Sequence, residues 1–319
     1  MIIEISEHGS VLKRNHDCFV IKNSSGKVEV PAEKARAVIV TANALISTQA
    51  ISLCIEKGIE LVLAEWSGKP FGRLWACSPG KATELRRKQY LNQDSVVAFN
   101  FSKEIVAKKL REQKRFLVEL KNNRSSGDNA LIDRAIRLLQ SNISSLKKIE
   151  FSCSFKQELL GIEGVAASFY FSAISSVLPN KYKFTERSRR PAGDPFNAVL
   201  NYAYGLTYAN VEKVVILSGL DPNAGFYHAD TYGKPTLVFD LIEVFRARVD
   251  RIAVKLFTKR IVRESWFQIL DHNGNSGVLL SKDARKNIIK EYVNNVSSIV
   301  EKEGWQYCKK LIDMLFCEG

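Results

Sequence analysis

Glu163 is a carboxylate in an otherwise apolar stretch, where its spacing from Leu159 and Tyr170 predicts one face of a helix. Burying a lone carboxylate is costly unless a cation or a metal ion neutralises it. Gly161 and Gly164 flank it, and each glycine weakens a helix interior by up to about 1 kcal/mol relative to alanine. We therefore expect another group to approach this helix closely. The alternative is a partly exposed glutamate paired with a nearby arginine.

A histidine and two more acids stand in later segments of the chain. His228 follows the turn signal that begins at Asp221-Pro222, and it is either a functional residue or an ordinary core or surface histidine. Asp240 and Glu243 are three residues apart, so on a helix they share a face and repel each other. A solvated helix start and a cation site both accommodate such a pair. Combined with Glu163, these residues form an oxygen-rich set with one nitrogen ligand, which suits Mn²⁺ or Mg²⁺ better than structural zinc.

The overall charge indicates a polyanionic partner. The 319 residues include 47 Lys and Arg against 34 Asp and Glu, a formal net charge of +13. Nucleic acid is the commonest partner of so basic a chain, and with a carboxylate-metal site it suggests phosphodiester chemistry. The 45% hydrophobic and 25% charged composition excludes a disordered chain. The sequence has no C-x-x-C pair and no glycine-rich nucleotide-binding loop.

Two regions of different character must position these residues, and they predict an α+β fold. Residues 1–80 predict a small N-terminal β domain, with one helix that Ser47 caps and Gly58 ends. The best linker candidate is Ser78-Pro79-Gly80-Lys81. Residues 81–319 predict a larger all-α catalytic domain that binds DNA, in which Ser281 caps the last helix. The expected helices span roughly 84–120, 128–147, 155–178, 195–210, 237–263 and 282–316.

No targeting or membrane segment is predicted. The N-terminus has acidic residues and lacks the basic-then-apolar order of a signal peptide. The longest weakly polar run, 165–178, is shorter than the roughly 20 residues that a membrane span needs. We therefore expect a cytoplasmic protein without a membrane partner.

Four motifs in a fixed order resemble those of the CRISPR-associated spacer-acquisition integrases, the first-numbered universal Cas protein family. They are GIEGVAASFYF at 161–171, RSRRP at 187–191 with DPFN at 194–197, GLDP at 219–222 with GFYH at 225–228, and LVFDLIEVFR at 237–246. The β-then-α layout resembles the family as well, so the likeness covers nearly the whole chain. Some members have Asp where this chain has Glu243, and many have a second proline where it has Ala192.

The resemblance implies a metal-dependent DNA endonuclease and integrase of CRISPR adaptation. Glu163, His228 and Glu243 would be the ligands of one Mn²⁺ or Mg²⁺ ion, with Asp240 beside them as a supporting group or an occasional ligand. A DNA 3′-hydroxyl would attack a phosphodiester at the border of a CRISPR repeat and insert a short fragment by transesterification. With water as the nucleophile the same site would act as a nuclease, and in reverse it would resolve branched DNA.

The resemblance also implies partners. Family members form homodimers through their β domains, and a dimer of the small second Cas protein bridges two of these dimers. The expected DNA partners are double-stranded fragments, branched DNA and the CRISPR repeat. We expect this DNA to contact basic residues of two segments and of one later helix. The candidates are Lys108, Arg111 and Arg115 on the first long helix, Arg187, Arg189 and Arg190 in the arginine-rich motif, and Arg246 next to Glu243.

Two alternatives remain beside this interpretation. One is a related integrase of a mobile DNA element. The other is a non-catalytic scaffold that binds nucleic acid and has kept the fold without the chemistry. The simultaneous presence of Glu163, His228 and Glu243 argues against the scaffold, because a protein without chemistry has no need of all three.

Overall fold

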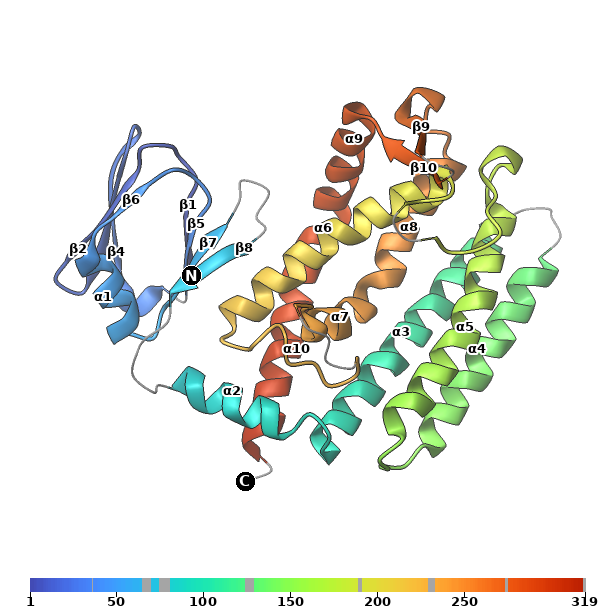
Figure 1. Ribbon diagram of the computed structural model, residues 1–319, viewed down its shortest axis with the longest axis horizontal. Coiled ribbons are helices and arrows are strands. Elements are labelled where there is room, and N and C mark those ends of the chain that lie inside the picture. The colour runs from blue at the N-terminus through green and yellow to red at the C-terminus, as the bar shows by residue number, and fades with distance from the viewer. Residues whose placement is uncertain are drawn as a thin grey trace. The chain divides into compact units, whose positions relative to one another are not determined.

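The computed structural model shows an N-terminal β region followed by a mostly helical region, as the sequence predicts (Figure 1). It describes residues 1–35, 37–64, 70–74, 81–123, 129–188, 191–228, 233–272 and 275–317. The chain divides into two compact units, one made of Met1–Leu91, Ala209–Pro222 and Trp305–Gly319, and one made of Asn92–Tyr208 and Asn223–Gly304. Ser78, Pro79 and Gly80 of the predicted linker lie outside the described residues.

The first unit is built on two four-stranded sheets. In one sheet, in the order β1-β5-β7-β8, the first three strands are parallel and β8 is antiparallel to β7. The other sheet, in the order β4-β3-β2-β6, has two antiparallel hairpin pairs and the short parallel strand β6 at its edge. The strand bounds are β1 Ile2–Ile5, β2 Val11–Asn15, β3 Cys18–Asn23, β4 Gly26–Pro31, β5 Ala37–Val40, β6 Leu45–Ile46, β7 Glu60–Ala64 and β8 Pro70–Leu74.

Helix α1 (Thr48–Glu56) belongs to the core of this unit. The Ser47 hydroxyl accepts a hydrogen bond from the Ala50 amide, and Gly58 follows the helix with φ +65°, so both predicted end signals are confirmed. Its buried face packs with apolar side chains of both sheets into one core. The other face of the β1-β5-β7-β8 sheet is covered by Ile216, Leu217 and Trp305, which come from much later in the chain.

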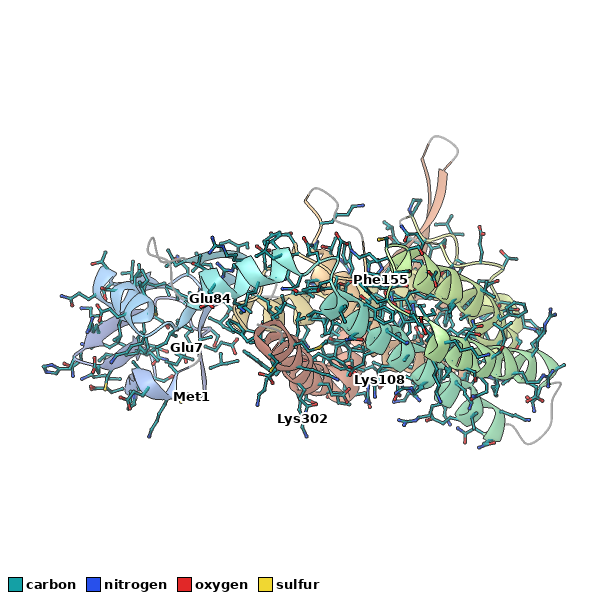
Figure 2. The ribbon with its side chains drawn as sticks, turned by 90° about the horizontal axis from the view of Figure 1, so that it is seen from below. Met1, Glu7, Glu84, Lys108, Phe155 and Lys302 are labelled. Carbon is teal, nitrogen blue, oxygen red and sulfur yellow. The ribbon has the colours of Figure 1, made fainter. Side chains whose placement is uncertain are left out.

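The second unit is dominated by long helices, of which α3 (Val96–Asn122), α4 (Ala130–Lys148) and α5 (Phe155–Val177) lie side by side. Figure 2 shows these three helices from below, with Lys108 on α3 and Phe155 at the first turn of α5 labelled. The remaining helices of the chain are α2 Lys81–Leu91, α6 Pro195–Leu217, α7 Thr236–Ile242, α8 Arg246–Thr258, α9 Lys282–Tyr292 and α10 Ser298–Cys317. Short 3₁₀ turns occur at Ala32–Lys34, Asn180–Tyr182, Glu243–Phe245 and Glu264–Trp266, and Val293–Ser297 is a π-helical turn.

By length and composition alone, α5 is apolar enough to cross a membrane. In the fold it packs against α3 and α4, and Tyr170 donates a hydrogen bond to Asp250 of α8 at 2.7 Å. Its buried apolar residues, among them Leu159 and Ile174, serve helix packing within the second unit, and Glu163 has a charged partner there.

Three expectations for the helical region are wrong in detail. The predicted 84–120 helix is broken at residues 92–95, because Ser95 caps α3 by accepting a hydrogen bond from the Val97 amide. The predicted 237–263 helix is divided by the 3₁₀ turn at Glu243–Phe245 and ends at Thr258. The region is not all-α, because β9 (Phe267–His272) pairs with β10 (Asn275–Leu280) in an antiparallel hairpin. Asn273-Gly274, which stands in the sequence between two short apolar runs, is the hairpin signal there.

Candidate active site

The buried ammonium of Lys109 joins two of the predicted site residues. Its Nζ forms an ion pair with Glu163, and it lies 2.5 Å from Oε2 of Glu243. The Lys109 and Glu243 side chains are 5% and 2% exposed, and Glu163 is 17% exposed. Arg246 Nε donates a second charged hydrogen bond to Glu243 Oε1 at 2.7 Å. Two carboxylates from distant segments thus converge on one cation.

Three helical segments bring this cluster together. Lys109 lies midway along α3, Glu163 lies in the third turn of α5, and Glu243 begins the 3₁₀ turn that follows α7. The helix α3 contacts α5, α7, α8 and the 3₁₀ turn. Glu163 lies on the same face as buried Leu159, Ala166 and Tyr170, as the helical spacing predicts.

The electrostatics of the cluster favour charged forms despite burial. Burial alone would raise the pKa of Glu243, but the charges of Arg246 and Lys109 outweigh it and hold the pKa at about 2. Burial alone would lower the pKa of Lys109, but the charges of Glu243 and Glu163 outweigh it and hold the pKa above its usual value. The Glu243 carboxylate and the Lys109 ammonium are therefore both ionised at neutral pH.

Asp240 is held in a different way, by backbone amides. Its Oδ2 accepts hydrogen bonds from the amides of Phe226 and Tyr227, at 2.6 and 3.0 Å. Its Oδ1 lies 2.9 Å from the amide nitrogen of His228 and 2.8 Å from Nδ1 of the same residue. Asp240 is completely buried. Because both of its oxygens are used within the protein, Asp240 is suited to positioning His228 and poorly suited to holding a metal ion itself.

His228 lies next to the carboxylate cluster. Its Nδ1 is engaged by Asp240, which leaves Nε2 as the nitrogen available to a ligand. Burial alone would lower the pKa of His228, but Asp240, followed by Glu243 and Glu163, raises it above its usual value. The Tyr227 ring packs 4.8 Å from the His228 ring, and the Tyr227 hydroxyl donates a hydrogen bond to Glu163. Tyr227 therefore connects the His228 loop to α5.

The loop that carries His228 requires a glycine at position 225. A Cβ there would lie 2.8 Å from the backbone carbon of Thr236, a contact that real Cβ atoms do not make. The Gly225 amide donates to the Thr236 hydroxyl at 2.9 Å, and that hydroxyl donates to the Asn223 carbonyl at 2.6 Å. The start of α7 thereby fixes the path of residues 223–228.

A cleft of about 430 Å³ opens beside the cluster. Arg187 and Arg246 both stack on the ring of Tyr204, with guanidinium carbons 5.7 and 4.8 Å from its centroid. The residues that line the cleft are Lys109, Gln113, Glu163, Ala167, Ser168, Phe171, Ser172, Thr185, Glu186, Arg187, Tyr204 and Arg246. Burial lowers the pKa of Arg187, whose guanidinium donates to Asn201 at 2.9 Å. A cationic wall next to two carboxylates is suited to a phosphate group.

Buried polar contacts fix Tyr204 under these two arginines. The hydroxyls of Tyr204 and Tyr170 donate to the two oxygens of Asp250, at 2.6 and 2.7 Å. Asp250 is completely buried, and burial raises its pKa although both tyrosines oppose that shift. This contact ties α5, α6 and α8 together behind the cleft.

The β9–β10 hairpin braces the arginine-rich segment. The Val278 amide donates to the Ala192 carbonyl at 2.9 Å, and a Cβ at Gly277 would lie 2.7 Å from the Pro191 ring. Arg189 and Arg190, which were expected to bind DNA, lie outside the described residues.

The basic residues of α3 divide between two environments. Lys108 and Arg115 each pair with Glu112 at 3.2 Å, so their charges are partly neutralised. Arg111 lines a groove of about 940 Å³ along α3 and α4, together with Lys103, Lys114, Arg115 and Lys147 and with two acids, Glu104 and Glu119. A groove of this charge is compatible with a DNA backbone.

The donor chemistry of the cluster fits a divalent metal ion. The two carboxylates already surround one cation, and Glu243 Oε2 is buried without a hydrogen bond of good geometry despite its nearness to Lys109. Among the described residues, however, no group of three His, Cys, Asp or Glu side chains is close enough to hold a metal ion. The predicted set of Glu163, His228 and Glu243 is thus brought into one neighbourhood without being gathered around one point.

The two glycines of α5 do not mark a close approach within the protein. A Cβ at Gly161 or Gly164 would meet nothing within 4 Å, so no described group of this chain packs against them. The space beside these glycines is open, so their helix-weakening effect has no packing reason in this chain.

Lys109 and Tyr227 are the site residues that the sequence interpretation missed. A signal for Lys109 exists in the sequence, because it falls in the buried stripe of α3 with Ile105, Gln113 and Phe116. A lysine in such a stripe needs a buried acidic partner. Tyr227 has no comparable signal, since its hydroxyl reaches Glu163 only through the fold of the loop.

Two solved structures share this fold over almost the whole chain. A partial Cas6-RT-Cas1–Cas2 complex superimposes with a TM-score of 0.76 and 18% identity, covering 100% of this chain and 96% of that one. A casposase bound to an integration product superimposes with a TM-score of 0.78 and 20% identity, covering 98% and 95%.

Sequence comparison establishes the family. A CRISPR-associated endonuclease Cas1 from Thermodesulfovibrio yellowstonii is 31% identical over 287 residues, which are 89% of this chain and 88% of that protein. The family described as CRISPR associated protein Cas1 matches residues 3–294, a range that covers most of both units and every residue of the site. The chain therefore belongs to the Cas1 family.

Proposed function

We propose that this protein is a metal-dependent DNA integrase and endonuclease of CRISPR adaptation. The observation that carries the proposal is the convergence of Glu163 and Glu243 on one buried cation, beside His228 and a cationic cleft. The name of the Thermodesulfovibrio relative supports nuclease chemistry, and the structural neighbours support strand transfer and a Cas2 partner.

In this proposal Glu163, Glu243 and His228, through its Nε2, would hold one Mn²⁺ or Mg²⁺ ion. When bound, the ion polarises a phosphoryl oxygen and stabilises the charge that develops during transesterification. Asp240 keeps His228 in the tautomer that presents Nε2, and Tyr227 orients Glu163. One phosphodiester bond replaces another, so the reaction needs no nucleotide triphosphate.

The residues of the cleft bind and orient the DNA. Arg187 and Arg246 stand where a phosphate beside the two carboxylates would lie, and Tyr204 holds both guanidiniums in place. Arg111 and its basic neighbours in the α3–α4 groove hold the backbone farther from the reaction. The homodimer and the small second Cas protein remain expected partners of the working complex.

A strand-transfer assay tests this function. The protein, with and without the small second Cas protein, is incubated with a labelled duplex bearing a 3′-hydroxyl and a supercoiled plasmid carrying a CRISPR repeat. We expect Mn²⁺- or Mg²⁺-dependent joining at the repeat border, and its loss in Glu163→Ala and His228→Ala.

The two alternatives give different products in the same assay. Equal joining at random plasmid sites, or at the end of a mobile element, would favour a mobile-element integrase. Tight DNA binding without a product under any metal condition would favour a non-catalytic scaffold and would contradict the proposed enzyme.

A further inference from the structure

Lys109 lies between Glu163 and Glu243, the two carboxylates that the proposed metal ion would need. Its Nζ pairs with both carboxylates, at 2.5 Å from Oε2 of Glu243. Oxygen ligands of divalent cations lie about 2.0–2.6 Å from the ion. An ammonium and a metal ion at such similar distances from the same oxygens exclude each other.

The buried position explains why the cluster needs a cation before any metal arrives. Two ionised carboxylates close together repel each other strongly when water is excluded, and an uncompensated buried charge is strongly destabilising. Glu243 is 2% exposed and has Arg246 on its other oxygen, so Lys109 is its partner on the Oε2 side. Lys109 also supplies the ion pair of Glu163.

We propose that Lys109 is a built-in substitute for the catalytic metal ion, which must displace its ammonium from between Glu163 and Glu243. This inference rests on the proposed function, because it takes the metal site there as given. Lysine is suited to such exchange, since its charge is a point at the end of a flexible four-carbon stem. The displaced ammonium has the neighbouring cleft to turn into, which Lys109 already lines together with Arg187 and Arg246.

The displaced position has a consequence for substrate binding. In the cleft, the ammonium becomes a third positive charge on the wall that is suited to a phosphate. Lys109 thus maintains the empty site in the absence of metal and adds to phosphate binding in its presence. It is a positioning residue in the first state and a binding residue in the second.

Mn²⁺ binding to the full chain tests the displacement, with free Mn²⁺ measured by electron paramagnetic resonance. We expect Lys109→Met to bind Mn²⁺ roughly tenfold more tightly than the wild type, the change expected if the ammonium occupies the site about 90% of the time. Its metal-free melting temperature should fall and its rise on adding Mn²⁺ should exceed that of the wild type. Lys121→Met is the matched control, because Lys121 pairs with the partly exposed Asp133 near the end of the same helix and should change neither value.

A second measurement keeps the test valid if Lys109→Met does not fold. In the wild type, labelling of Lys109 by an amine-reactive reagent, read by mass spectrometry, should increase when Mn²⁺ is added. If the wild type binds Mn²⁺ while Lys109→Met binds it equally or more weakly, or labelling stays unchanged, displacement is wrong and the proposed function stands. If neither protein binds Mn²⁺, the metal dependence of the proposed function fails, and the displacement fails with it.

Discussion

The His228 loop and the Lys109 cluster hold buried acids by opposite means. In the loop region, Asp240 is fixed by three backbone amides and the His228 ring. In the cluster, the described residues that hold Glu243 are the side chains of Lys109 and Arg246. Backbone donors cannot move without unfolding the loop, whereas charged side chains can be exchanged for another cation. Asp240 and Glu243 are only three residues apart. The difference between their partners therefore comes from the groups that surround each acid and not from their spacing in the sequence.

Neutralising Glu243, the acid whose cationic partners can be exchanged, should have the largest effect on strand transfer. We expect Glu243→Gln to reduce strand transfer by at least about 100-fold, more than the 10–100-fold that follows from losing a supporting group of a metal site. DNA binding, measured by electrophoretic mobility shift, should change little, because Arg187 and the α3–α4 groove remain. Glu303→Gln is the control, since Glu303 pairs with Arg248 away from the cluster. Equal losses of strand transfer in Glu243→Gln and Glu303→Gln would contradict the assignment of Glu243 to the metal site.

Neutralising Asp240, the acid that backbone amides hold, should have a smaller effect on strand transfer and a clear effect on the free energy of unfolding. Asp240→Asn replaces an acceptor oxygen with an amide donor that faces backbone donors, at an expected loss of about 1–3 kcal/mol in unfolding free energy. Strand transfer should fall roughly 10–100-fold through misplacement of His228. Chemical denaturation and the strand-transfer rate measure the two effects. A loss of activity as large as that of Glu243→Gln would make Asp240 a direct metal ligand.

Alanine substitutions at Gly277, which is crowded, and at Gly161, which faces open space, should change the stability of the protein in opposite directions. Gly277→Ala forces a contact with the Pro191 ring and should destabilise the protein by about 1–3 kcal/mol, while weakening DNA binding through the arginine-rich segment. Gly161→Ala meets nothing and should stabilise α5 by about 0.5–1 kcal/mol. Thermal unfolding and mobility shift assays compare them. If Gly161→Ala is stabilising yet weakens DNA binding, the open space beside Glu163 is a place for DNA.

The smallest expected effect concerns a single proton on His228. The folded protein raises the pKa of His228 above its ordinary 6.5, chiefly through Asp240 acting against burial. The folded state therefore binds this proton more tightly than the unfolded chain. The stability that this proton contributes is fully present below about pH 6.5, the pKa of the unfolded chain. It is lost as the pH rises through the higher pKa of His228 in the folded state. Chemical denaturation in a chelator across this range should show the loss in the wild type and a flatter profile in Asp240→Asn; identical profiles would contradict it.

The strand-rich character of the N-terminal region and the ends of α1 could be predicted because local chemistry determines them. Ser47 and Gly58 act through their own hydroxyl and their own φ angle, which neighbouring sequence does not alter. The break before α3 and the 3₁₀ turn at Glu243 could not be located in the same way. Both lie within stretches that are free of glycine and proline and have helical periodicity, and tertiary packing decides where such stretches are interrupted.

The candidate site was predictable to the extent that its members violate a local pattern. Glu163 interrupts an apolar face, and His228 follows a strong turn. The role of Asp240 as a support of His228 was foreseen only as one of two possibilities, since it depends on hydrogen bonds to a loop twelve residues away. Lys109 lies in the buried stripe of α3, but the sequence does not identify its partners, which are 54 residues away and farther along the chain.

The cover over the β1-β5-β7-β8 sheet bears on how the protein is handled in the laboratory. Ile216, Leu217 and Trp305 shield the apolar face formed by Ala37, Ile39, Val62 and Ala64. A truncated gene product that stopped near residue 80 would present this face bare to water, and exposed apolar patches promote aggregation. Recombinant work on the N-terminal strands therefore needs the whole polypeptide, or a shortened version in which those four positions carry polar side chains.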